Sequence, residues 1–566
     1  MKKKWWHDKV AYQIYPKSFL DTNGDGIGDL RGIISKLDYL KELGIDIIWL
    51  SPIYKSPFVD QGYDISDYYA IAQEFGTMEE FDELLAEAKK RGMYIVMDLV
   101  VNHCSDQHEW FKKALADPDG EYADYFYFVK GKDGREPSNY RSYFGGNAWE
   151  PVPGTDKYYL HMFAKEQPDL NWENPALREE IYKMVNWWLD RGIAGFRIDA
   201  IINIKKDLTW EDLPVDGPDG RGFLTNSITR MQKRDGGTKN GIGVFLRELK
   251  ERCFAPHDAF TVGEVFEVDR EQLEEFIGED GYFSTMFAFD PIQSYKKGTC
   301  QCEFDRNMNP DEWKQDVFVN QKLLGDIAFE ANIIENHDMA RGATIYIPDE
   351  DYGFASISAL AGLQVLQRGM PFLYQGQEIG MTNCPFELED IDDIMTLDNY
   401  RYAVACGFPE EKAFAGCARE SRDNARTPMQ WSDAENAGFT TGKPWLKVNP
   451  NYPEINVARQ EKEYGSVLNF YRRLLCFRKS EEYRDLLTYG TFEPMYEDQE
   501  RIFAFKRTLG KQCLTVICNE SSAERFLTLK EDYEEVVFVN LPQVTRIGDN
   551  LILHPYQLIV VETTKK

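Results

Sequence analysis

The sequence predicts an α/β protein built on a (β/α)8 TIM barrel, with a subdomain inserted after the third strand and an antiparallel β domain at the C-terminus. Strand-like and helix-like segments alternate up to about residue 485, and eight strands are counted among them. The alternation fails after residue 103, in a part rich in Gly, Pro, Tyr and Asp. From about residue 486 only short strands remain. We therefore expect a barrel of residues 1–103 and 172–485, an insertion of residues 104–171, and a β-sandwich of residues 486–566.

The predicted barrel strands are short apolar runs separated by helical segments. Residues 94–101 are almost continuously apolar, as expected of a parallel strand that helices cover on both faces. The eight strands are predicted at residues 10–19, 45–53, 94–101, 193–202, 259–266, 282–289, 331–335 and 371–374. In the C-terminal domain, strands are predicted at residues 501–507, 513–518 and 551–562.

Several predicted helices carry start and stop signals. Apolar residues recur at helical spacing over residues 30–43. Thr77 and Glu80 have the spacing of a capping box at a helix start. Asn174 followed by Pro175 has the pattern of an N-cap and a first helical residue. Glycines at 44, 92 and 192 follow the predicted helix ends, where a left-handed residue is common.

Composition excludes several classes of function. The 566 residues carry a formal net charge of −30, which repels nucleic acid and anionic membrane surfaces. No apolar run is long enough to span a bilayer, and none follows the basic N-terminus, so we expect no membrane anchor and no signal peptide. The ten cysteines are scattered, with only Cys300 and Cys302 close together. This favours reduced thiols in a cytoplasmic protein, with a secreted protein as the alternative because the number of cysteines is even. We separately expect a monomer or weak homo-oligomer.

Four predicted strand ends carry reactive side chains. In a barrel of this kind, active sites lie at the C-terminal ends of the strands. Each group taken alone is explained by a helix cap or an ion pair. Four such groups at the same end of one barrel indicate an active site. The four groups are Asp98 to His103, Arg197 with Asp199, Glu264, and Glu335 to Asp338.

Arg197 and Asp199 lie two residues apart on one predicted strand, so their side chains face the same way. A fixed guanidinium favours the carboxylate form of Asp199, which suits a nucleophile or an electrostatic stabiliser. A purely structural ion pair is the alternative for this stretch taken by itself.

Carboxylates, Arg and His around one mouth, without a metal-ligand cluster, fit glycoside hydrolysis by an acid and a nucleophile. Glu264 follows Gly263 among apolar residues, where desolvation would raise its pKa and let it hold a proton. Asp338 is a third carboxylate. His103 and His337 are candidate hydrogen-bond donors to sugar hydroxyls, with satisfied strand-end histidines as the alternative.

The stretches Asp98–His103, Gly195–Asp199, Gly263–Glu264 and Asn336–Asp338 resemble the signature regions of the α-amylase family of glycoside hydrolases. The resemblance extends from Trp5 into the C-terminal β domain. Within the family, the sequence is most similar to the oligo-1,6-glucosidase and α-glucosidase group. That similarity is carried by residues 61–68 and 421–431, while residues 44–52, 167–172 and 369–378 resemble further signatures of the family as a whole.

The resemblance implies roles for individual residues. It implies Asp199 as the nucleophile, Glu264 as the general acid/base, and Asp338 as the residue that grips sugar hydroxyls in the transition state. It implies that Asp64 and Arg426 close the pocket around the non-reducing end, which would make the enzyme exo-acting. The same resemblance lines the glucose subsite with Tyr63, His103, Arg197 and His337.

Three departures from the family pattern bear on specificity. Ala200 follows the nucleophile where Val tends to accompany cleavage of α-1,6 bonds, so it tilts the expectation toward α-1,4-linked substrates. A difference of two methyl carbons changes selectivity by about 1–2 kcal/mol, which makes this a preference only. Met339-Ala340 replaces the usual Gln-Pro, and residues 207–243 also differ from the common pattern.

The loop of residues 21–29 resembles the opening of a calcium loop. Oxygen-bearing residues alternate and Gly26 occupies the sixth position, but Gly32 stands where the bidentate Glu of an EF-hand belongs. An ordinary Asx-turn loop is the alternative. No cofactor is expected for catalysis; we expect a structural Ca²⁺ or Mg²⁺ held by Asp21, Asn23, Asp25, the Ile27 carbonyl and Asp29.

The sequence therefore predicts a retaining exo-α-glucosidase that hydrolyses terminal non-reducing α-linked glucose from short oligosaccharides of the maltose or isomaltose type, through a β-glucosyl-enzyme. Hydrolysis of a disaccharide phosphate, as of trehalose 6-phosphate, and sucrose isomerisation would use the same catalytic groups. A catalytically inactive relative associated with a transporter is the alternative from a different class. It predicts lost carboxylates and a membrane anchor, and the sequence shows neither.

Overall fold

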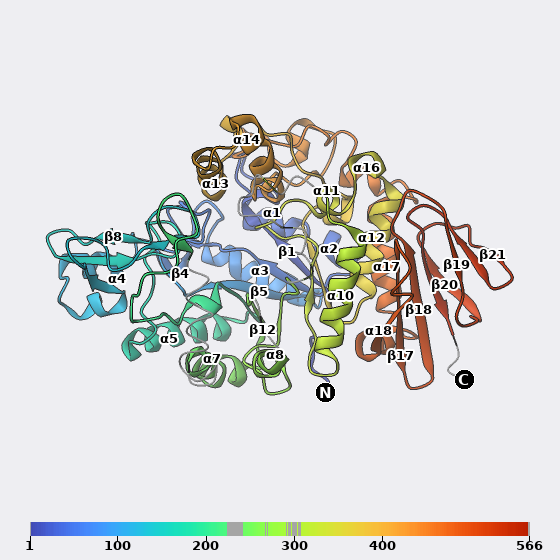
Figure 1. Cartoon of the computed structure of the whole chain (residues 1–566), viewed down its shortest axis with the longest axis horizontal. Helices are drawn as coiled ribbons and strands as arrows, with labels where there is room; N and C mark the ends of the chain where they lie inside the picture. The colour runs from blue at the N-terminus through green and yellow to red at the C-terminus, as the bar shows by residue number, and fades with distance from the viewer. Residues whose placement is uncertain are drawn as a thin grey trace.

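The computed structural model describes residues 2–223, 241–266, 268, 270–289, 291, 296, 303 and 307–563 (Figure 1). Eight parallel strands pair in the order β13-β12-β10-β5-β2-β1-β15-β14. A parallel bridge between Phe287 and Ala331 joins the two outer strands and closes the sheet. This confirms the predicted barrel. Its strands are β1 (Ala11–Ile14), β2 (Ile47–Leu50), β5 (Tyr94–Val100), β10 (Gly195–Asp199), β12 (Phe260–Gly263), β13 (Thr285–Met286), β14 (Ala331–Asn332) and β15 (Met370–Tyr374).

Helices cover the outside of the barrel and bury its strands. Thr77 and Glu80 form the predicted capping box, and Asn174 accepts a hydrogen bond from the Ala176 amide as an N-cap. The predicted helix over residues 30–43 is divided in two, because Lys36 leaves the helical conformation. The covering helices include α1 (Leu30–Ser35), α2 (Leu37–Leu43), α3 (Met78–Lys90), α5 (Pro175–Arg191), α7 (Ile242–Leu249), α8 (Arg270–Ile277), α10 (Pro310–Leu324), α12 (Phe354–Leu366) and α17 (Val467–Arg478).

The part between residues 104 and 171 is irregular, as expected, and lies at the left of Figure 1. It packs its own apolar cluster around Trp149, to which Leu213 from beyond the fourth barrel strand also contributes. Arg141 forms ion pairs with Asp216 and Asp219 across the same contact. Its elements are α4 (Glu109–Ala116), β6 (Phe128–Lys130), β7 (Tyr140–Arg141), β8 (Trp149–Pro151) and β9 (Lys157–Leu160); β7 pairs with β11 (Gly222–Phe223).

The segment between β15 and residue 430 contributes three α-helices. In Figure 1, α13 and α14 lie above the barrel, away from the C-terminal strands. The shortest of the three is a four-residue helix that brings Arg422 and Arg426 to the barrel mouth. The three are α13 (Ile394–Ala405), α14 (Glu410–Arg419) and α15 (Asp423–Arg426).

The C-terminal part is an antiparallel β domain, as predicted, and lies at the right of Figure 1. Five strands form one sheet in the order β16-β17-β18-β23-β20, and three form another in the order β19-β22-β21. The predicted strand at residues 551–562 is two strands, because the turn at 554–557 separates them. The strands are β16 (Thr491–Met495), β17 (Ile502–Leu509), β18 (Gln512–Asn519), β19 (Arg525–Thr528), β20 (Glu535–Val539), β21 (Thr545–Ile547), β22 (Asn550–Leu553) and β23 (Leu558–Glu562).

Two other expectations can be checked against the described part of the chain. Among its helices, none combines the length and the apolar composition that crossing a bilayer requires. Its eight cysteines form no disulfide. Cys300 and Cys302 lie outside the described residues. The three domain boundaries stay predictions.

Candidate active site

Three neighbouring strands bring one arginine and three carboxyl groups together at the barrel mouth. In the register of the sheet, Arg197 on β10 lies beside Asp98 on β5, and Glu264 directly follows β12. Arg197 Nη1 lies 3.0 Å from Asp98 Oδ1 and 2.6 Å from Asp199 Oδ1, and its Nη2 lies 3.2 Å from Glu264 Oε2. We call these four residues the Arg197 cluster. The single buried guanidinium of Arg197 therefore pairs with three carboxyl groups.

Charge balance and burial set the proton occupancy of the Arg197 cluster. Burial raises the pKa of Asp98 to about 6, although Arg197 opposes the shift. Burial likewise raises the pKa of both Asp199 and Glu264, again against the pull of Arg197. This differs from the expectation that Arg197 alone keeps Asp199 ionised. Asp199 has the shorter contact with Arg197, so the guanidinium favours the carboxylate form more strongly at Asp199 than at Glu264.

Ala200 links the two carboxyl groups through its backbone. Its amide donates to Glu264 Oε2 at 2.7 Å, directly after Asp199 in the chain. Ala200 has φ +42° and ψ +30°, in the left-handed region that a β-branched residue adopts only with strain. This turn therefore fixes the position of Glu264 relative to Asp199.

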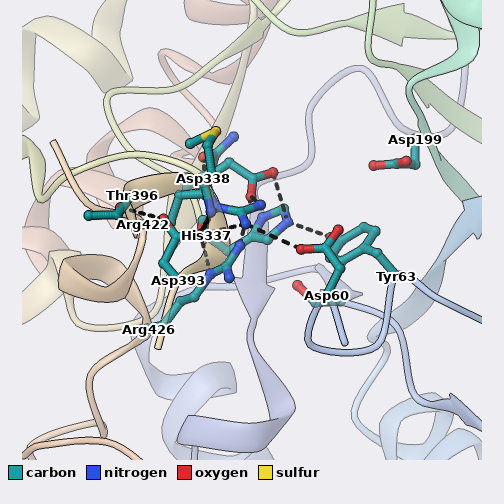
Figure 2. A network of polar contacts seen from close by, with 12 residues as sticks. Asp60, Tyr63, Asp199, His337, Asp338, Asp393, Thr396, Arg422 and Arg426 are labelled. Carbon is teal, nitrogen blue, oxygen red and sulfur yellow. Dashed lines mark hydrogen bonds and ion pairs between the residues drawn. The ribbon is translucent and has the colours of Figure 1, made fainter. Parts of the chain in front are cut away.

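A second cluster of charged residues lies across the mouth from Asp199 (Figure 2). Asp338 Oδ1 lies 2.9 Å from Arg426 Nη2 and 3.4 Å from Arg422 Nη1. Arg422 Nη2 also contacts Asp60 at 3.2 Å and Asp393 at 2.6 Å. We call Asp60, Asp338, Asp393, Arg422 and Arg426 the Asp338 cluster.

In the Asp338 cluster the cations outweigh burial at the central carboxylate. Burial would raise the pKa of Asp338, but His337, Arg422 and Arg426 hold it well below its usual range. His337 Nε2 lies 3.0 Å from Asp338 Oδ2, and burial lowers the pKa of His337 to about 4. Asp338 is therefore ionised, and a neutral His337 donates to it. Gln13 Nε2 lies 2.7 Å from His337 Nδ1, which fits the same tautomer.

Tyr63 and His103 lie with these groups, as the sequence predicts. Tyr63 donates to Asp98 Oδ2 at 3.1 Å and contacts the His337 ring nitrogen, so it joins the Arg197 cluster to the histidine that pairs with Asp338. His103 Nε2 lies 3.1 Å from the Tyr63 carbonyl and 3.1 Å from Gln167 Nε2. Burial lowers the pKa of His103 to about 4, so its ring is neutral near pH 7.

The structure does not place Asp64 at the pocket. Asp64 Oδ1 accepts hydrogen bonds from the Ser56 hydroxyl and the Asp60 amide, and Oδ2 accepts one from the Val59 amide. Its carboxylate is thus used inside the turn of residues 56–64 and is 0% exposed. Asp60, four residues earlier in the same motif, turns toward Arg422 instead (Figure 2).

Arg426 reaches the barrel mouth, where it contacts Asp338. Asp64 and Arg426 were expected to close the pocket together, but the contact between the two loops is made by Asp60 and Arg422. Both arginines lie within residues 421–431, which carry the resemblance to the α-glucosidase group. The sequence therefore indicated this stretch as part of the site but did not indicate the direction of each side chain. Asp393 lies in the acidic run 387–393, and no sequence motif marks it as a site residue. Met339 and Ala340 directly follow Asp338, and residues 224–240 of the divergent stretch lie outside the described residues.

The loop of residues 21–29 is folded around its own side chains. Asp21 accepts from the amides of Asn23, Gly24 and Gly26, Asn23 accepts from Asp25, and Asp25 accepts from Ile27. Asp29 caps α1 at the Gly32 amide and contacts Thr22. The alternating turns gather oxygen atoms, the donors that Ca²⁺ prefers. In the described part of the chain, no group of three or more His, Cys, Asp or Glu residues is arranged to hold a metal.

Comparison with known proteins covers nearly the whole chain. Residues 13–490 match the catalytic domain of alpha amylase. The oligo-1,6-glucosidase of Bacillus cereus is 42% identical, with 99% of each chain covered. The glucan 1,6-alpha-glucosidase of Streptococcus pneumoniae is 41% identical and covers 99% of this chain and 100% of its own.

Solved structures of similar proteins superpose on the same length of chain. The isomaltulose synthase of Klebsiella sp. LX3 has a TM-score of 0.91 at 38% identity and covers 99% of this chain and 100% of its own. The trehalulose synthase of Pseudomonas mesoacidophila MX-45 has a TM-score of 0.90 at 40% identity, with 100% of each chain covered. By its matched catalytic domain and its relatives, this chain belongs to the α-amylase family of glycoside hydrolases.

Proposed function

We propose that the protein is a retaining exo-α-glucosidase that releases glucose from the non-reducing end of short α-linked oligosaccharides. The observation that carries this proposal is the single guanidinium of Arg197 in contact with both Asp199 and Glu264. In retaining enzymes the two carboxyl groups lie about 5–5.5 Å apart, against about 6.5–9.5 Å in inverting ones. Two carboxyl groups that share one guanidinium fit the shorter spacing.

In the proposed mechanism, Asp199 attacks the anomeric carbon while Glu264 gives its proton to the leaving oxygen. The glucosyl–oxygen bond breaks, and a β-glucosyl ester forms on Asp199. Glu264, now a carboxylate, takes a proton from water, and the resulting hydroxide displaces Asp199 to give α-glucose. The ionised Asp338 accepts hydrogen bonds from sugar hydroxyls, which strengthen as positive charge develops on the sugar ring.

The Asp60–Arg422 contact supports exo action. These residues are far apart in the chain and come from two different loops, and their contact joins the loops beside Asp338. A carboxylate and a guanidinium in this position bind vicinal hydroxyls of a terminal glucose in charge-assisted hydrogen bonds. A longer chain extending from that end would meet the joined loops, so only a terminal residue fits.

A proton NMR time course with maltose and isomaltose in parallel tests this function. First appearance of α-glucose supports retention, and first appearance of β-glucose contradicts it. Ala200 favours faster loss of maltose, whereas the names of the relatives favour isomaltose. Turnover of neither disaccharide contradicts the proposed substrate class and directs the assay to phosphorylated disaccharides.

Sucrose isomerisation is a second candidate, favoured by the similarity to isomaltulose and trehalulose synthases. It would use the same glucosyl-enzyme, with fructose in place of water as the acceptor. Chromatography of a sucrose digest separates the two activities. Isomaltulose or trehalulose as the main product supports isomerisation, and glucose plus fructose supports hydrolysis.

A structural Ca²⁺ or Mg²⁺ is part of the proposal for loop 21–29. Asp21, Asn23, Asp25, the Ile27 carbonyl and Asp29 would hold it and brace the loop against Thr440. Bound metal stabilises the folded state by mass action. Calorimetry with and without a chelator tests this: a lower Tm that added Ca²⁺ restores supports the site, and an Asp25→Ala variant should lose that response. An unchanged Tm contradicts it.

A further inference from the structure

Glu335 belongs to the fourth group of reactive residues predicted at the barrel mouth, yet the proposed reaction gives it no task. Its side chain is buried, with 2% of the residue exposed. Oε1 accepts a hydrogen bond from Arg341 Nη1 at 3.2 Å, and Oε2 accepts one from the Gly342 amide. Glu335 therefore closes the loop of residues 335–342, which contains Asp338.

Arg341, near the other end of this loop, is 0% exposed. Its guanidinium offers five N–H donors in a fixed fork, and each of them has a partner. Two of the partners are carbonyls of α15, so Arg341 joins the loop that contains Asp338 to that helix. Apart from Glu335, the partners are the carbonyls of Gln375 at 2.7 Å, Ala425 at 3.1 Å and Asn424 at 3.3 Å, and the Met381 sulfur at 3.7 Å.

The helix α15 needs such partners because it has only four residues. A helix this short is not stable by itself, and its last four carbonyl groups have no partner within the helix. Arg341 supplies donors to two of them, and the Tyr374 hydroxyl donates to the Ala425 carbonyl at 2.8 Å. Buried side chains from outside the helix therefore hold the carbonyl end of α15 in place.

The placement of α15 decides where the two arginines of the Asp338 cluster lie (Figure 2). Arg422 is the N-cap of the helix, and Arg426 is its last residue. Residues four apart in a helix lie on one face, and both guanidinium groups contact Asp338 Oδ1. Arg426 Nε also donates to the His337 carbonyl at 2.9 Å. A shift of α15 relative to the loop would therefore change the position of both guanidinium groups relative to Asp338.

We propose that Arg341, held by Glu335, is a positioning residue that aligns Arg422 and Arg426 with Asp338. It acts by fixing α15 against the loop that contains Asp338, and it affects the substrate only through those two arginines. This role rests on the proposed function, in which Asp338 and Arg422 bind the terminal glucose. A lysine could not replace Arg341, because an ammonium group has three donors and lacks the planar fork.

Arg341→Lys tests this role, because it keeps the charge and removes the fork. A misplacement of about 1 Å costs about 10²-fold in rate, and we expect kcat/KM for a glucoside to fall by that factor. Arg507→Lys is the matched control, because Arg507 is also 0% exposed and donates to the carbonyls of Leu366, Leu487 and Gly490, where α12 meets β17. That variant should lower Tm and leave kcat/KM within about twofold.

A double-mutant cycle shows whether Arg341 acts through the arginines of α15. Arg426→Met removes one of the two guanidinium groups, so adding Arg341→Lys to it should cost at least about fivefold less than in the unchanged protein. Equal costs in the two backgrounds overturn the positioning role, as does a loss of kcat/KM in Arg507→Lys equal to that in Arg341→Lys. If Arg341→Lys does not fold, Tyr374→Phe decides the matter. It removes only the hydroxyl on the Ala425 carbonyl and should lower kcat/KM about threefold, and an unchanged kcat/KM would then overturn the role.

Crystal structures of the unchanged protein and of Arg341→Lys separate this role from the proposed reaction. We expect the contact between Arg426 Nη2 and Asp338 Oδ1, 2.9 Å in the unchanged protein, to lengthen beyond hydrogen-bond distance in the variant. A lengthened contact supports the positioning role even if the unchanged protein turns over no glucoside, a result that would contradict the proposed reaction alone. A retained contact with an unchanged kcat/KM overturns the positioning role and leaves the proposed reaction standing.

Discussion

The Arg197 cluster and the Asp338 cluster use the same residue types at one barrel mouth, yet the pKa values of Asp199 and Asp338 shift in opposite directions. In the first, three carboxyl groups share one arginine, and burial raises the pKa of each. In the second, two arginines and His337 surround Asp338 and hold its pKa well below its usual range. At Asp338 the surrounding cations outweigh burial, whereas at Asp60 of the same cluster burial still raises the pKa despite Arg422.

The difference separates two chemical tasks. A proton donor must hold a proton near neutral pH, which the cation-poor Arg197 cluster allows at Glu264. A residue that binds hydroxyls and stabilises positive charge must stay ionised, which the cation-rich Asp338 cluster ensures. Figure 2 shows Asp199 of the Arg197 cluster lying apart from the residues of the Asp338 cluster.

The largest expected effect is loss of turnover when the Arg197 cluster is changed. Asp199→Ala removes the proposed nucleophile, and Glu264→Gln removes the proposed proton donor. General acid catalysis contributes about 10²–10⁴-fold, and we expect kcat to fall by at least about 10³-fold in both variants. Steady-state kinetics with a glucoside checks this, with circular dichroism as the control for folding. Near-normal kcat in either variant would show that the cluster is structural.

The next effect distinguishes Asp60 from Asp64. Asp60→Asn loses a charge in contact with Arg422, and we expect kcat/KM to fall about 10²-fold because a charge-assisted hydrogen bond to substrate is lost. Asp64→Asn changes only the turn, so kcat/KM should stay within about threefold while Tm falls. Kinetics and calorimetry on this matched pair check both statements. A larger loss of kcat/KM in Asp64→Asn than in Asp60→Asn would show that Asp64, and not Asp60, binds the substrate.

How much of this arrangement could be predicted depends on the local backbone. Period-two and period-3.6 patterns predict the barrel strands and the caps at Thr77 and Asn174, and the structure confirms them. Arg197 and Asp199 were predicted to face the same way because they lie on a strand, and both contact the same site. The choice between Asp60 and Asp64 was not predictable, because a turn has no period that fixes the direction of its side chains.

The same limit applies to proton occupancy. The sequence indicates that Arg197 neighbours Asp199, which suggests a lowered pKa. It does not show that Asp98 and Glu264 share that arginine, since strand register and the turn at Ala200 decide this. The number of charged groups around a buried carboxyl group therefore follows from the fold and cannot be read from the neighbouring sequence.

The two clusters should also differ in the sign of their effect on stability. The pKa of Asp199 is raised in the folded state, so its ionisation destabilises the fold as pH rises above the usual carboxyl range. The pKa of Asp338 is lowered, so its stabilisation is present above that range and is lost as pH falls. At pH 7 we expect Asp199→Asn to raise Tm and Asp338→Asn to lower it, each by about 2 °C or more.

Calorimetry at pH 7 and at pH 4.5 checks this pair of variants. The gain in Asp199→Asn should shrink at pH 4.5, because Asp199 of the unchanged protein then binds its proton in the fold. The loss in Asp338→Asn should persist at pH 4.5, because the pKa of Asp338 lies lower still. Shifts of the same sign in both variants would remove the distinction between the clusters.

The smallest expected effect measures how strongly one cluster acts on the other. After burial and Arg197, the charge of Asp338 is the next influence on Glu264, and it raises the pKa of that acid. Asp338→Asn removes this charge, so the basic limb of the kcat/KM profile, where Glu264 loses its proton, should move to lower pH by less than about one unit. The profile of the residual activity in Asp338→Asn checks this, with Asp64→Asn as the control that should not move the limb. A limb that stays in place would mean that the two clusters titrate independently and that the pKa of Glu264 is set within the Arg197 cluster alone.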